Sequence, residues 1–364
     1  MKLASQKNTT TLPFTAQLSR STQIKTDLIF VKKHIYIAYT GGTIGMEPSA
    51  QGYVPKAGFL ANTLAAMTEL THEEMPDYTL HEYQPLIDSS DMSPRHWQII
   101  AEDIRQNYEK YDGFVVLHGT DTMAFTASAL SFMFENLSKP VVVTGSQIPI
   151  AQLRSDGQTN LLNALYIAAN YPIHEVGLFF NNKLLRGNRS KKIHSDGLAA
   201  FNSPNLPPLL EAGIKIKPIE GVVKDNINQE LLVADIKSQA IGVIMLYPGI
   251  QAEVIRNAVL QPVKALILIS YGVGNAPNSK EFIQAIKHAI DNGTIVVNCT
   301  QCLKGGVDMQ SYATGNTLKN LGVVSAKNMT FEASLAKLHY LLSKELSSNT
   351  IKQMFEDNLR GEMD

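Results

Sequence analysis

The chain has 364 residues, of which 44% are apolar and 18% charged, and its formal net charge at pH 7 is −1. This length exceeds what one hydrophobic core usually organises, so two domains are expected, and the apolar fraction excludes a largely disordered protein. The small net charge and the lack of a long basic run argue against nucleic acid or an anionic membrane as a partner. No run of about 18 apolar residues occurs, so no membrane-spanning helix is predicted.

Residues 1–30 lack the apolar segment and the small-residue cleavage site of a secretory signal, so we expect a disordered tail and a cytoplasmic location. The only two cysteines, Cys299 and Cys302, form a Cys-x-x-Cys pair at the end of a late predicted strand. No nearby His or further Cys completes a zinc site, so we predict structural thiols and no metal. Sparse cysteine also fits a reducing cytoplasm.

From His34 onward, short apolar runs alternate with helix-length segments. This alternation predicts an α/β domain with a mostly parallel sheet flanked by helices. Ser93 and Pro94 mark one helix start, as cap and first-turn residue. The expected strands are 35–40, 113–118, 141–144 and 176–180; the expected helices are 59–70, 93–108 and 159–170; and loops are expected at 46–54 and 186–197.

Prolines at 204, 207 and 208 break this pattern, and residues 221–239 are polar and weakly periodic. We place the interdomain linker at 221–239, with a larger N-terminal domain over 31–220 and a smaller α/β domain over 240–364. The smaller domain is predicted to contain strands 241–247, 264–270 and 294–298 and a closing helix at 330–346.

The first strand of the larger domain runs directly into Thr40-Gly41-Gly42-Thr43-Ile44. Glycine permits a tight turn and lets a ligand approach the backbone, and open α/β sheets place their chemistry at the carboxyl ends of strands. No helical pattern follows the turn, which excludes a dinucleotide-type phosphate cradle. The turn alone also fits a simple strand-to-loop connection in which Thr43 bonds only locally.

A second strand ends in the same way, in His118-Gly119-Thr120-Asp121-Thr122. Together the two stretches resemble the signature motifs of the asparaginase/glutaminase family, and the resemblance extends from about Lys33 to the C-terminus. The chain looks similar to the cytosolic type I bacterial L-asparaginases. Agreeing stretches are Gln51–Tyr53, Asp88–Met92, Arg154–Gly157, Arg186–Arg189 and Tyr271–Asn275.

The resemblance implies a two-domain asparaginase fold and the hydrolysis of L-asparagine to L-aspartate and ammonia without a cofactor. It implies that Thr43 is the acylated nucleophile and that Thr120, Asp121 and Lys192 form a second catalytic set. Tyr53, on a closing loop, would assist proton transfer. This division of labour suits amide hydrolysis, which needs a nucleophile, a proton carrier and donors for the oxyanion.

The resemblance also implies how substrate is bound. The implied substrate-binding residues are Asp88, Ser89, Ser90, Thr120, Asp121, Ser146 and Asn275. A homotetramer built as a pair of dimers is implied, in which Asn275 and the turn before it close a neighbouring active site. Thr300, Gln301 and Cys302 mark a candidate effector site.

Several residues have simpler interpretations. Lys191 adjoins Lys192 and could exchange roles with it, Asp121 could cap a helix, and His118 is expected to be a packing residue. Trp97, the only tryptophan, is expected in the core.

Other functions fit the sequence less well. A serine hydrolase would need a Gly-x-Ser-x-Gly elbow, which is missing. An amidotransferase component acting on aminoacyl-tRNA is expected to carry a further N-terminal domain. A module that only binds amino acids would not need Thr43 and Lys192.

Overall fold

The computed structural model describes residues 32–50, 52–219, 229–261, 263–311 and 313–364. The predicted tail at 1–30 and residues 221–228 of the predicted linker lie outside the described residues. The described residues from Lys33 to Asp364 pack as one unit. No helix in the described ranges is long and apolar enough to cross a membrane.

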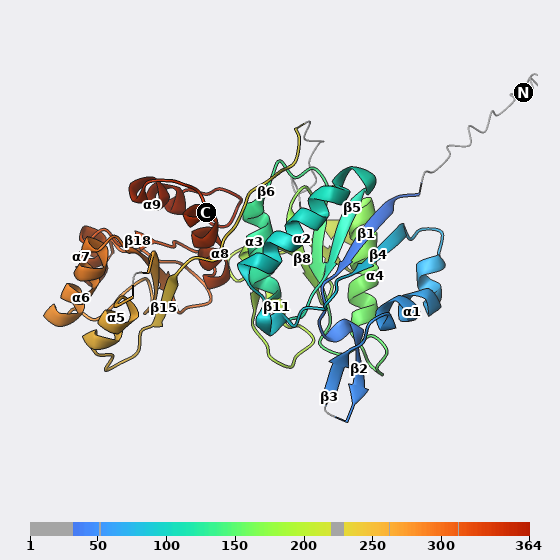
Figure 1. The fold of residues 1–364 in the computed structure, drawn as a ribbon, viewed down its shortest axis with the longest axis horizontal. Coiled ribbons are helices and arrows are strands. Elements are labelled where there is room, and N and C mark those ends of the chain that lie inside the picture. Colours follow the sequence, from blue (N-terminus) through green and yellow to red (C-terminus); the bar gives the residue numbers. More distant parts are fainter. Residues whose placement is uncertain (1–31, 51, 220–228, 262, 312) are drawn as a thin grey trace, which may run out of the picture. The chain divides into compact units, whose positions relative to one another are not determined.

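An eight-stranded sheet forms the centre of the larger part, with strand order β13-β12-β9-β8-β7-β5-β1-β4 (Figure 1). Its parallel strands are β1 (His34–Tyr39), β4 (Asp77–Glu82), β5 (Gly113–Leu117), β7 (Val141–Thr144) and β8 (Val176–Phe180). Its antiparallel strands are β9 (Lys183–Arg186), β12 (Leu210–Ala212) and β13 (Ile216–Pro218). The sheet is therefore mixed, and its parallel half contains all four strands that the sequence predicted.

The change of direction comes from the two-residue connection between β8 and β9. Asn181 and Asn182 have φ angles of 46° and 63°, and Phe180 pairs with Lys183 across the turn. Two successive positive φ angles are typical of the hairpin turn whose twist matches that of its strands, and Asn tolerates this conformation better than most residues.

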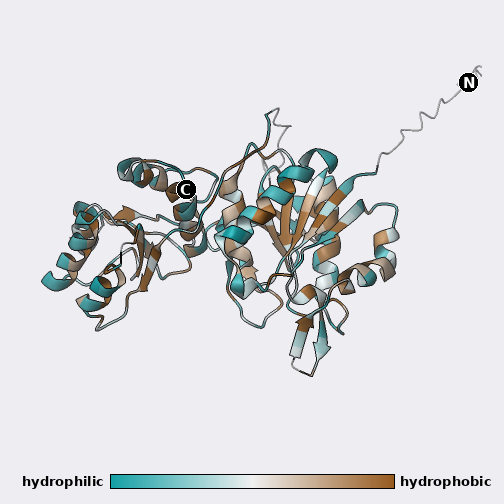
Figure 2. Ribbon diagram, viewed as in Figure 1, coloured by the Kyte–Doolittle hydropathy of each residue, from teal (hydrophilic) through white to brown (hydrophobic). Residues whose placement is uncertain are grey.

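Helices cover both faces of this sheet: α1 (Phe59–Ala66), α2 (Pro94–Asn107), α3 (Met123–Met133) and α4 (Gly157–Asn170). Each central strand divides its side chains between two hydrophobic cores. Val116 packs in the core formed with α2 and α3, and Val115 packs in the core formed with α1 and α4. Figure 2 shows these strands in brown between helices with teal outer faces. Burial on both faces explains why the strands read as continuous apolar runs.

The smaller sheet is wholly parallel and contains β15 (Ile241–Met245), β16 (Ala265–Ser270), β17 (Ile295–Thr300) and β18 (Val324–Ser325). Its helices are α5 (Ala252–Ala258), α6 (Lys280–Asp291), α7 (Ala313–Asn320), α8 (Phe331–Leu342) and α9 (Ser348–Glu356). The apolar stripe of α6, at Phe282, Ala285, Ile286 and Ala289, packs on one face of the sheet. The other face packs against α8.

Three predictions about local structure were wrong. The predicted closing helix ends at Leu342, and α9 follows because Ser347 starts a new helix by accepting a hydrogen bond from the Thr350 N–H (3.2 Å). The predicted loop at 46–54 is a hairpin of β2 (Met46–Ser49) and β3 (Gly52–Pro55).

The third correction concerns the basic stretch at 186–197, which is ordered and not a loop throughout. It contains a turn of 3₁₀ helix (Gly187–Arg189) and the strand β10 (Lys191–Lys192), which pairs with β11 (Phe201–Asn202). Arg189 is buried because its guanidinium donates hydrogen bonds to the Gly361 carbonyl (2.8 Å) and the Asp364 carboxylate (2.8 Å). Partners from the C-terminal residues therefore hold the Arg189 side chain inside the protein.

The described part of the predicted linker, residues 229–239, packs against the larger part. Its strand β14 (Leu232–Val233) pairs with β6 (Phe134–Glu135), and the side chain of Ile236 is buried. Helices α3 and α8 also pack together, with the rings of Phe132 and Tyr340 stacked 5.9 Å apart.

Candidate active site

The carboxyl ends of β1, β5 and β7 lie side by side, because Leu117 pairs with both Tyr39 and Thr144. The turns beyond these ends are in close contact. A methyl group on Gly42 would lie 2.4 Å from the Gly119 nitrogen, and one on Gly119 would lie 2.4 Å from Ser89 Oγ. Only glycine fits at both positions, and Gly42 also has a φ of 93°. The turns bearing Thr43, Thr120 and Ser89 therefore meet at one edge of the sheet.

Lys192 lies at the centre of this edge. Its Nζ donates hydrogen bonds to Thr120 Oγ1 (2.9 Å) and to Asp121 Oδ1 (2.8 Å). Thr120 is 7% exposed, whereas the Asp121 side chain is 66% exposed. The structure thus brings together a hydroxyl, an amine and a carboxylate that lie up to 72 positions apart in the sequence.

The neighbouring lysine has a different environment. Lys191 Nζ donates to Oε1 of the buried Glu332, at the start of α8, at 2.9 Å. Successive residues of a strand point to opposite sides, which directs Lys191 to α8 and Lys192 to Thr120. The contacts therefore favour Lys192 for the chemical role.

The residues expected to hold the substrate's charged groups lie in a short turn next to these strand ends. Asp88 Oδ1 accepts hydrogen bonds from the N–H and the hydroxyl of Ser90, each at 2.9 Å. Asp88 and Ser90 are exposed and Ser89 is buried. Thr122, one position after Asp121, donates its hydroxyl to the Ser89 carbonyl (2.7 Å), which attaches the turn to the Thr120 segment.

Thr43 begins a short 3₁₀ turn (Thr43–Gly45) and is half-buried. Tyr53 lies on β3, opposite Pro48, with 52% of its surface exposed. Ser146 follows β7, and its buried hydroxyl has no hydrogen-bond partner within the described residues. None of these three side chains is hydrogen-bonded to the Lys192 group in the part of the chain that the structure describes.

Asn275 lies elsewhere, in a turn after β16 of the smaller sheet, where its backbone bridges to Tyr271. The candidate effector residues lie at the end of β17. Thr300 Oγ1 donates to the Gly272 carbonyl (2.5 Å), and Gln301 Nε2 donates to the Leu246 carbonyl (2.6 Å). Together with Cys302, they line a cavity of about 200 Å³ that Lys191 also borders.

Gln147 belongs to the site but was missed by sequence reasoning. Its Oε1 accepts the hydrogen bond of the Thr120 hydroxyl (3.0 Å). Gln147 lies three residues beyond Thr144, just as Thr120 lies three residues beyond Leu117, and these two strand ends are paired. Equal offsets beyond paired parallel strands are a signal that could have identified it.

His118 has the packing role that the sequence predicted. Its Nδ1 donates to the Gly119 carbonyl (2.7 Å), so its Nε2 accepts from the Thr126 hydroxyl (2.9 Å), which in turn accepts from Trp97 Nε1 (3.1 Å). Burial lowers the pKa of His118 from 6.5 to about 4, so the ring is neutral at pH 7.

Both cysteines are free thiols. Cys299 is buried in β17, and burial raises its pKa to about 12, which keeps the thiol protonated and unreactive at pH 7. Cys302 is exposed. Within the described ranges, no group of three or more His, Cys, Asp or Glu side chains is arranged to hold a metal ion.

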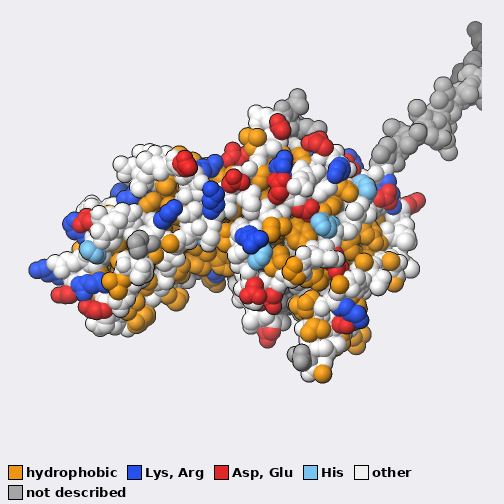
Figure 3. Space-filling view, viewed as in Figure 1, with side chains coloured by type: hydrophobic (Ala, Val, Ile, Leu, Met, Phe, Trp, Pro, Cys, Tyr) orange, Lys and Arg blue, Asp and Glu red, His pale blue; other side chains and the backbone are white. Residues whose placement is uncertain are grey.

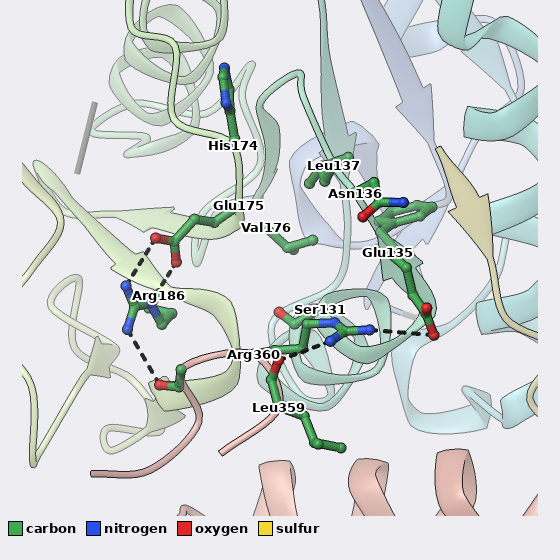
Figure 4. Close-up of a pocket in the computed structure, with 12 residues that line it drawn as sticks. Ser131, Glu135, Asn136, Leu137, His174, Glu175, Val176, Arg186, Leu359 and Arg360 are labelled. Atoms are coloured by element: carbon green, nitrogen blue, oxygen red, sulfur yellow. Dashed lines mark hydrogen bonds and ion pairs between the residues drawn. The ribbon is translucent and has the colours of Figure 1, made fainter. Parts of the chain in front are cut away.

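A cavity of about 460 Å³ lies apart from the Lys192 group (Figure 4). The figure shows its two arginines already paired, Arg186 with Glu175 and Arg360 with Glu135. On the face drawn in Figure 3, basic and acidic side chains are likewise interspersed.

Similarity to known proteins identifies the family. The family model "Asparaginase, N-terminal" matches residues 34–222, and "Glutaminase/Asparaginase C-terminal domain" matches residues 240–355. The chain therefore belongs to the asparaginase family, as the two threonine motifs predicted.

Individual relatives can be named. The chain is 63% identical to L-asparaginase 1 of Escherichia coli K12 over 332 residues, covering 91% of this chain and 98% of the relative. It resembles the crystal structure of L-asparaginase I from Vibrio cholerae with a TM-score of 0.86 and 62% identity, covering 92% of this chain and 99% of the other. It also resembles the structure of the thermostable L-asparaginase from Thermococcus kodakarensis with a TM-score of 0.82 and 31% identity, covering 91% of this chain and 99% of the other.

Proposed function

We propose that this protein is an L-asparaginase, which hydrolyses the side-chain amide of L-asparagine to L-aspartate and ammonia. The observation that carries the proposal is the Lys192–Thr120–Asp121 group, at the sheet edge that also bears Thr43, in a chain of the asparaginase family. The 63% identity to an L-asparaginase over almost the whole of that relative supports the choice of asparagine.

In the proposed reaction, Thr43 Oγ attacks the amide carbon of asparagine. The carbon–nitrogen bond breaks, the hydroxyl proton is passed to the departing nitrogen, and ammonia leaves an aspartyl ester on Thr43. Water then cleaves the ester and returns a proton to Thr43. Lys192, Thr120 and Asp121 take part in these proton transfers and stabilise the charges that develop, and Tyr53, on the β2–β3 hairpin, assists.

Substrate binding is assigned by the same reasoning. Asp88, Ser89 and Ser90 form a turn with carboxylate, hydroxyl and N–H groups, which suits the α-amino and α-carboxylate groups of an amino acid. Thr120 and Asp121 complete this set. The N–H groups at Thr43 and near Ser146 are the proposed donors to the oxyanion.

We further infer a homotetramer, in which Asn275 of one protomer completes the site of another. Asn275 follows a strand of the smaller sheet, whereas Thr43 and Thr120 follow strands of the larger one. In the proposed tetramer, Asn275 of a neighbouring protomer would lie next to Thr43 and Thr120. Thr300, Gln301 and Cys302 are the proposed effector site, because they border a cavity next to Lys191. The proposed location is the cytoplasm.

Ammonia release from L-asparagine and L-glutamine tests the function directly. We expect rapid turnover of asparagine and slower turnover of glutamine, which is longer by one methylene; such a difference usually discriminates by about 10–200-fold. Thr43→Ala should remove nearly all turnover, and a chelator should leave the wild-type rate unchanged. The assignment of the nucleophile fails if Thr43→Ala keeps more than about a tenth of the wild-type rate.

A further inference from the structure

A segment that is distant in the sequence holds the backbone just before Lys192. Residues 358–364 follow α9, and Arg189 donates hydrogen bonds to the Gly361 carbonyl (2.8 Å) and the Asp364 carboxylate (2.8 Å) of this segment. Arg189 is only 3% exposed. Because a buried guanidinium has to be paired, these two acceptors determine where its side chain lies. Arg189 precedes Lys192 by three residues, and consecutive Cα atoms are about 3.8 Å apart, so a displacement of one reaches the other.

The 3₁₀ turn that carries Arg189 is held by two neighbours. A methyl group on Gly187 would lie 2.9 Å from the Val176 carbonyl oxygen, so β8 packs directly against the backbone of the turn. The segment after α9 supplies the second neighbour, because Asn188 Nδ2 donates to the Arg360 carbonyl (3.0 Å). Asn188 is fully buried. The turn can therefore move only if it breaks buried contacts.

The segment 358–364 has a defined shape of its own. The Glu362 carboxylate accepts hydrogen bonds from the N–H groups of Leu359 (3.0 Å) and Arg360 (2.7 Å). These bonds lie within the segment and do not depend on its neighbours. Met363 is 1% exposed and belongs to the hydrophobic core that also contains side chains of α8. The segment thus offers its carbonyl groups to Arg189 from a fixed position.

Asp364 connects this segment to the smaller part of the protein. One carboxylate oxygen accepts from Arg189 and the other accepts from Asn328 Nδ2 (2.6 Å), while the Asp364 N–H donates to Asn328 Oδ1 (3.1 Å). The Asp364 side chain is nevertheless 72% exposed. It can therefore be replaced without opening the core, which makes it a suitable position for a test.

We propose that Arg189 is a positioning residue, which acts through Lys192 and takes its own position from the segment 358–364. The inference rests on the proposed function, because it concerns the amine of that reaction. Lys192 Nζ has to stay within hydrogen-bond distance of Thr120 Oγ1 (2.9 Å) and Asp121 Oδ1 (2.8 Å). Arg189 keeps it there by fixing the backbone that leads into β10.

Replacing Arg189 should separate the rate of the reaction from substrate binding. Arg189→Met removes both hydrogen bonds but keeps an unbranched apolar stem. We expect kcat per folded molecule to fall roughly 10- to 100-fold, since a misplacement of about 1 Å costs this much. KM should change less than about threefold, because Asp88 and Ser90 lie in a different turn.

Replacing Asp364 should give a smaller effect of the same kind. Asp364→Ala removes one of the two acceptors of Arg189, and we expect kcat to fall about 3- to 10-fold. Asp364→Asn keeps an acceptor oxygen at this position and should stay within about twofold of wild type. Glu253→Ala is the matched control, because Glu253 is 65% exposed and pairs with Arg256 at 2.6 Å. It should leave kcat unchanged.

A double variant distinguishes positioning of Lys192 from a general distortion. In a Lys192→Met background no amine remains to be positioned, so Arg189→Met should cause no further loss of kcat. An equal loss of kcat in both backgrounds overturns the proposal. It is also overturned by an Arg189→Met kcat within about twofold of wild type, or by an Asp364→Ala kcat equal to that of Glu253→Ala.

The test also separates this inference from the proposed function. If wild type and Glu253→Ala release no ammonia from asparagine, the proposed function is wrong, and crystal structures of wild type and Arg189→Met then decide the positioning role. The role requires Lys192 Nζ to lie farther from Thr120 Oγ1 in the variant by about 1 Å or more. An unchanged distance overturns it. If Arg189→Met does not fold, Asp364→Ala takes its place in the double variant and in the crystals.

Discussion

Two lysines in this protein make nearly the same contacts in very different surroundings. Lys192 Nζ donates to a hydroxyl and to a carboxylate, that of Asp121, at 2.8 Å. Lys337 Nζ, on α8, donates to the Glu362 carboxylate (2.5 Å) and to the carbonyl oxygens of Phe355 and Asp357. The Lys337–Glu362 pair is fully buried, whereas the Lys192 and Asp121 side chains are 20% and 66% exposed.

The difference shows what turns an ion pair into a candidate reactive group. Among the residues that the structure describes, the hydrogen-bond acceptors of Lys337 Nζ are two backbone carbonyls and a carboxylate, which is itself fixed by the N–H groups of Leu359 and Arg360. Burial opposes ionisation of Glu362, but Lys337 and these N–H groups outweigh it and lower the pKa of the carboxyl. Lys192 instead contacts a hydroxyl and a carboxylate, that of Asp121, which is 66% exposed. Contact distances alone do not distinguish the two lysines, but the hydroxyl partner and the solvent access of Asp121 do.

The largest expected effect is the loss of turnover when Lys192 is replaced. Lys192→Met removes the amine but keeps the length of the side chain, and we expect turnover of asparagine to fall about 10³-fold or more. The melting temperature should change by less than about 3 °C, because an ion pair with an exposed carboxylate contributes little to stability. Ammonia release and thermal unfolding measure the two effects. A variant that loses stability but keeps its turnover would reverse the roles assigned to the two lysines.

The sequence is enough to predict the active-site role of Lys192 but not the burial of Lys337. The threonine motifs and the stretch around Lys192 form a recognisable set, and their strand ends converge because parallel strands share an edge. Lys337 lies in a helix, where a charged residue is normally expected at the surface. Its partners come from the return of the chain after α9, which no periodic pattern signals.

Other features differ in whether the sequence alone could reveal them. The Asn181–Asn182 turn, which begins the antiparallel part of the sheet, and the matching offset of Gln147 and Thr120 are short local signals. The burial of Arg189 could not be foreseen, since its partners Gly361 and Asp364 lie 172 and 175 positions away. Local turn chemistry was thus readable in principle, whereas contacts between distant segments were not.

The second prediction concerns the buried pair. Lys337→Met leaves the Glu362 carboxylate buried without its cation, which usually costs about 3–5 kcal/mol of unfolding free energy. We expect the midpoint of urea unfolding to fall clearly, while kcat per folded molecule stays within about threefold of wild type. Unfolding curves and active-site assays on the same samples test this.

A double variant provides the control for this result. Lys337→Met with Glu362→Gln removes both charges, so it should be more stable than Lys337→Met alone. If the double variant is no more stable than the single one, the uncompensated carboxylate is not the cause of the loss.

The third prediction concerns His118, which lies two residues before Thr120 but contributes to stability rather than chemistry. Its pKa is about 4 in the folded protein and near 6.5 when the chain unfolds. Between these values the unfolded chain binds more protons, so the unfolding free energy falls as the pH is lowered, by up to about 3 kcal/mol from this residue alone. Urea unfolding between pH 7 and pH 4 measures the slope. His118→Gln should show a shallower slope than wild type, and parallel slopes would contradict the assignment.

The smallest effect is expected at a third lysine–carboxylate pair, Lys287 and Asp291 on α6. Their contact of 2.7 Å is as short as that of Lys192 and Asp121, but both side chains are more than half exposed, at 59% and 58%. Water solvates such charges almost as well as they solvate each other, and spacing of i and i+4 on a helix adds only a few tenths of a kcal/mol. We therefore expect Lys287→Ala to change the unfolding free energy by less than about 0.5 kcal/mol and to leave turnover unchanged. Urea unfolding and ammonia release, measured beside Lys192→Met and Lys337→Met, place the three pairs on one scale. A loss at Lys287 as large as that at Lys337 would mean that contact distance, rather than burial and the neighbouring groups, determines the contribution of a lysine in this protein.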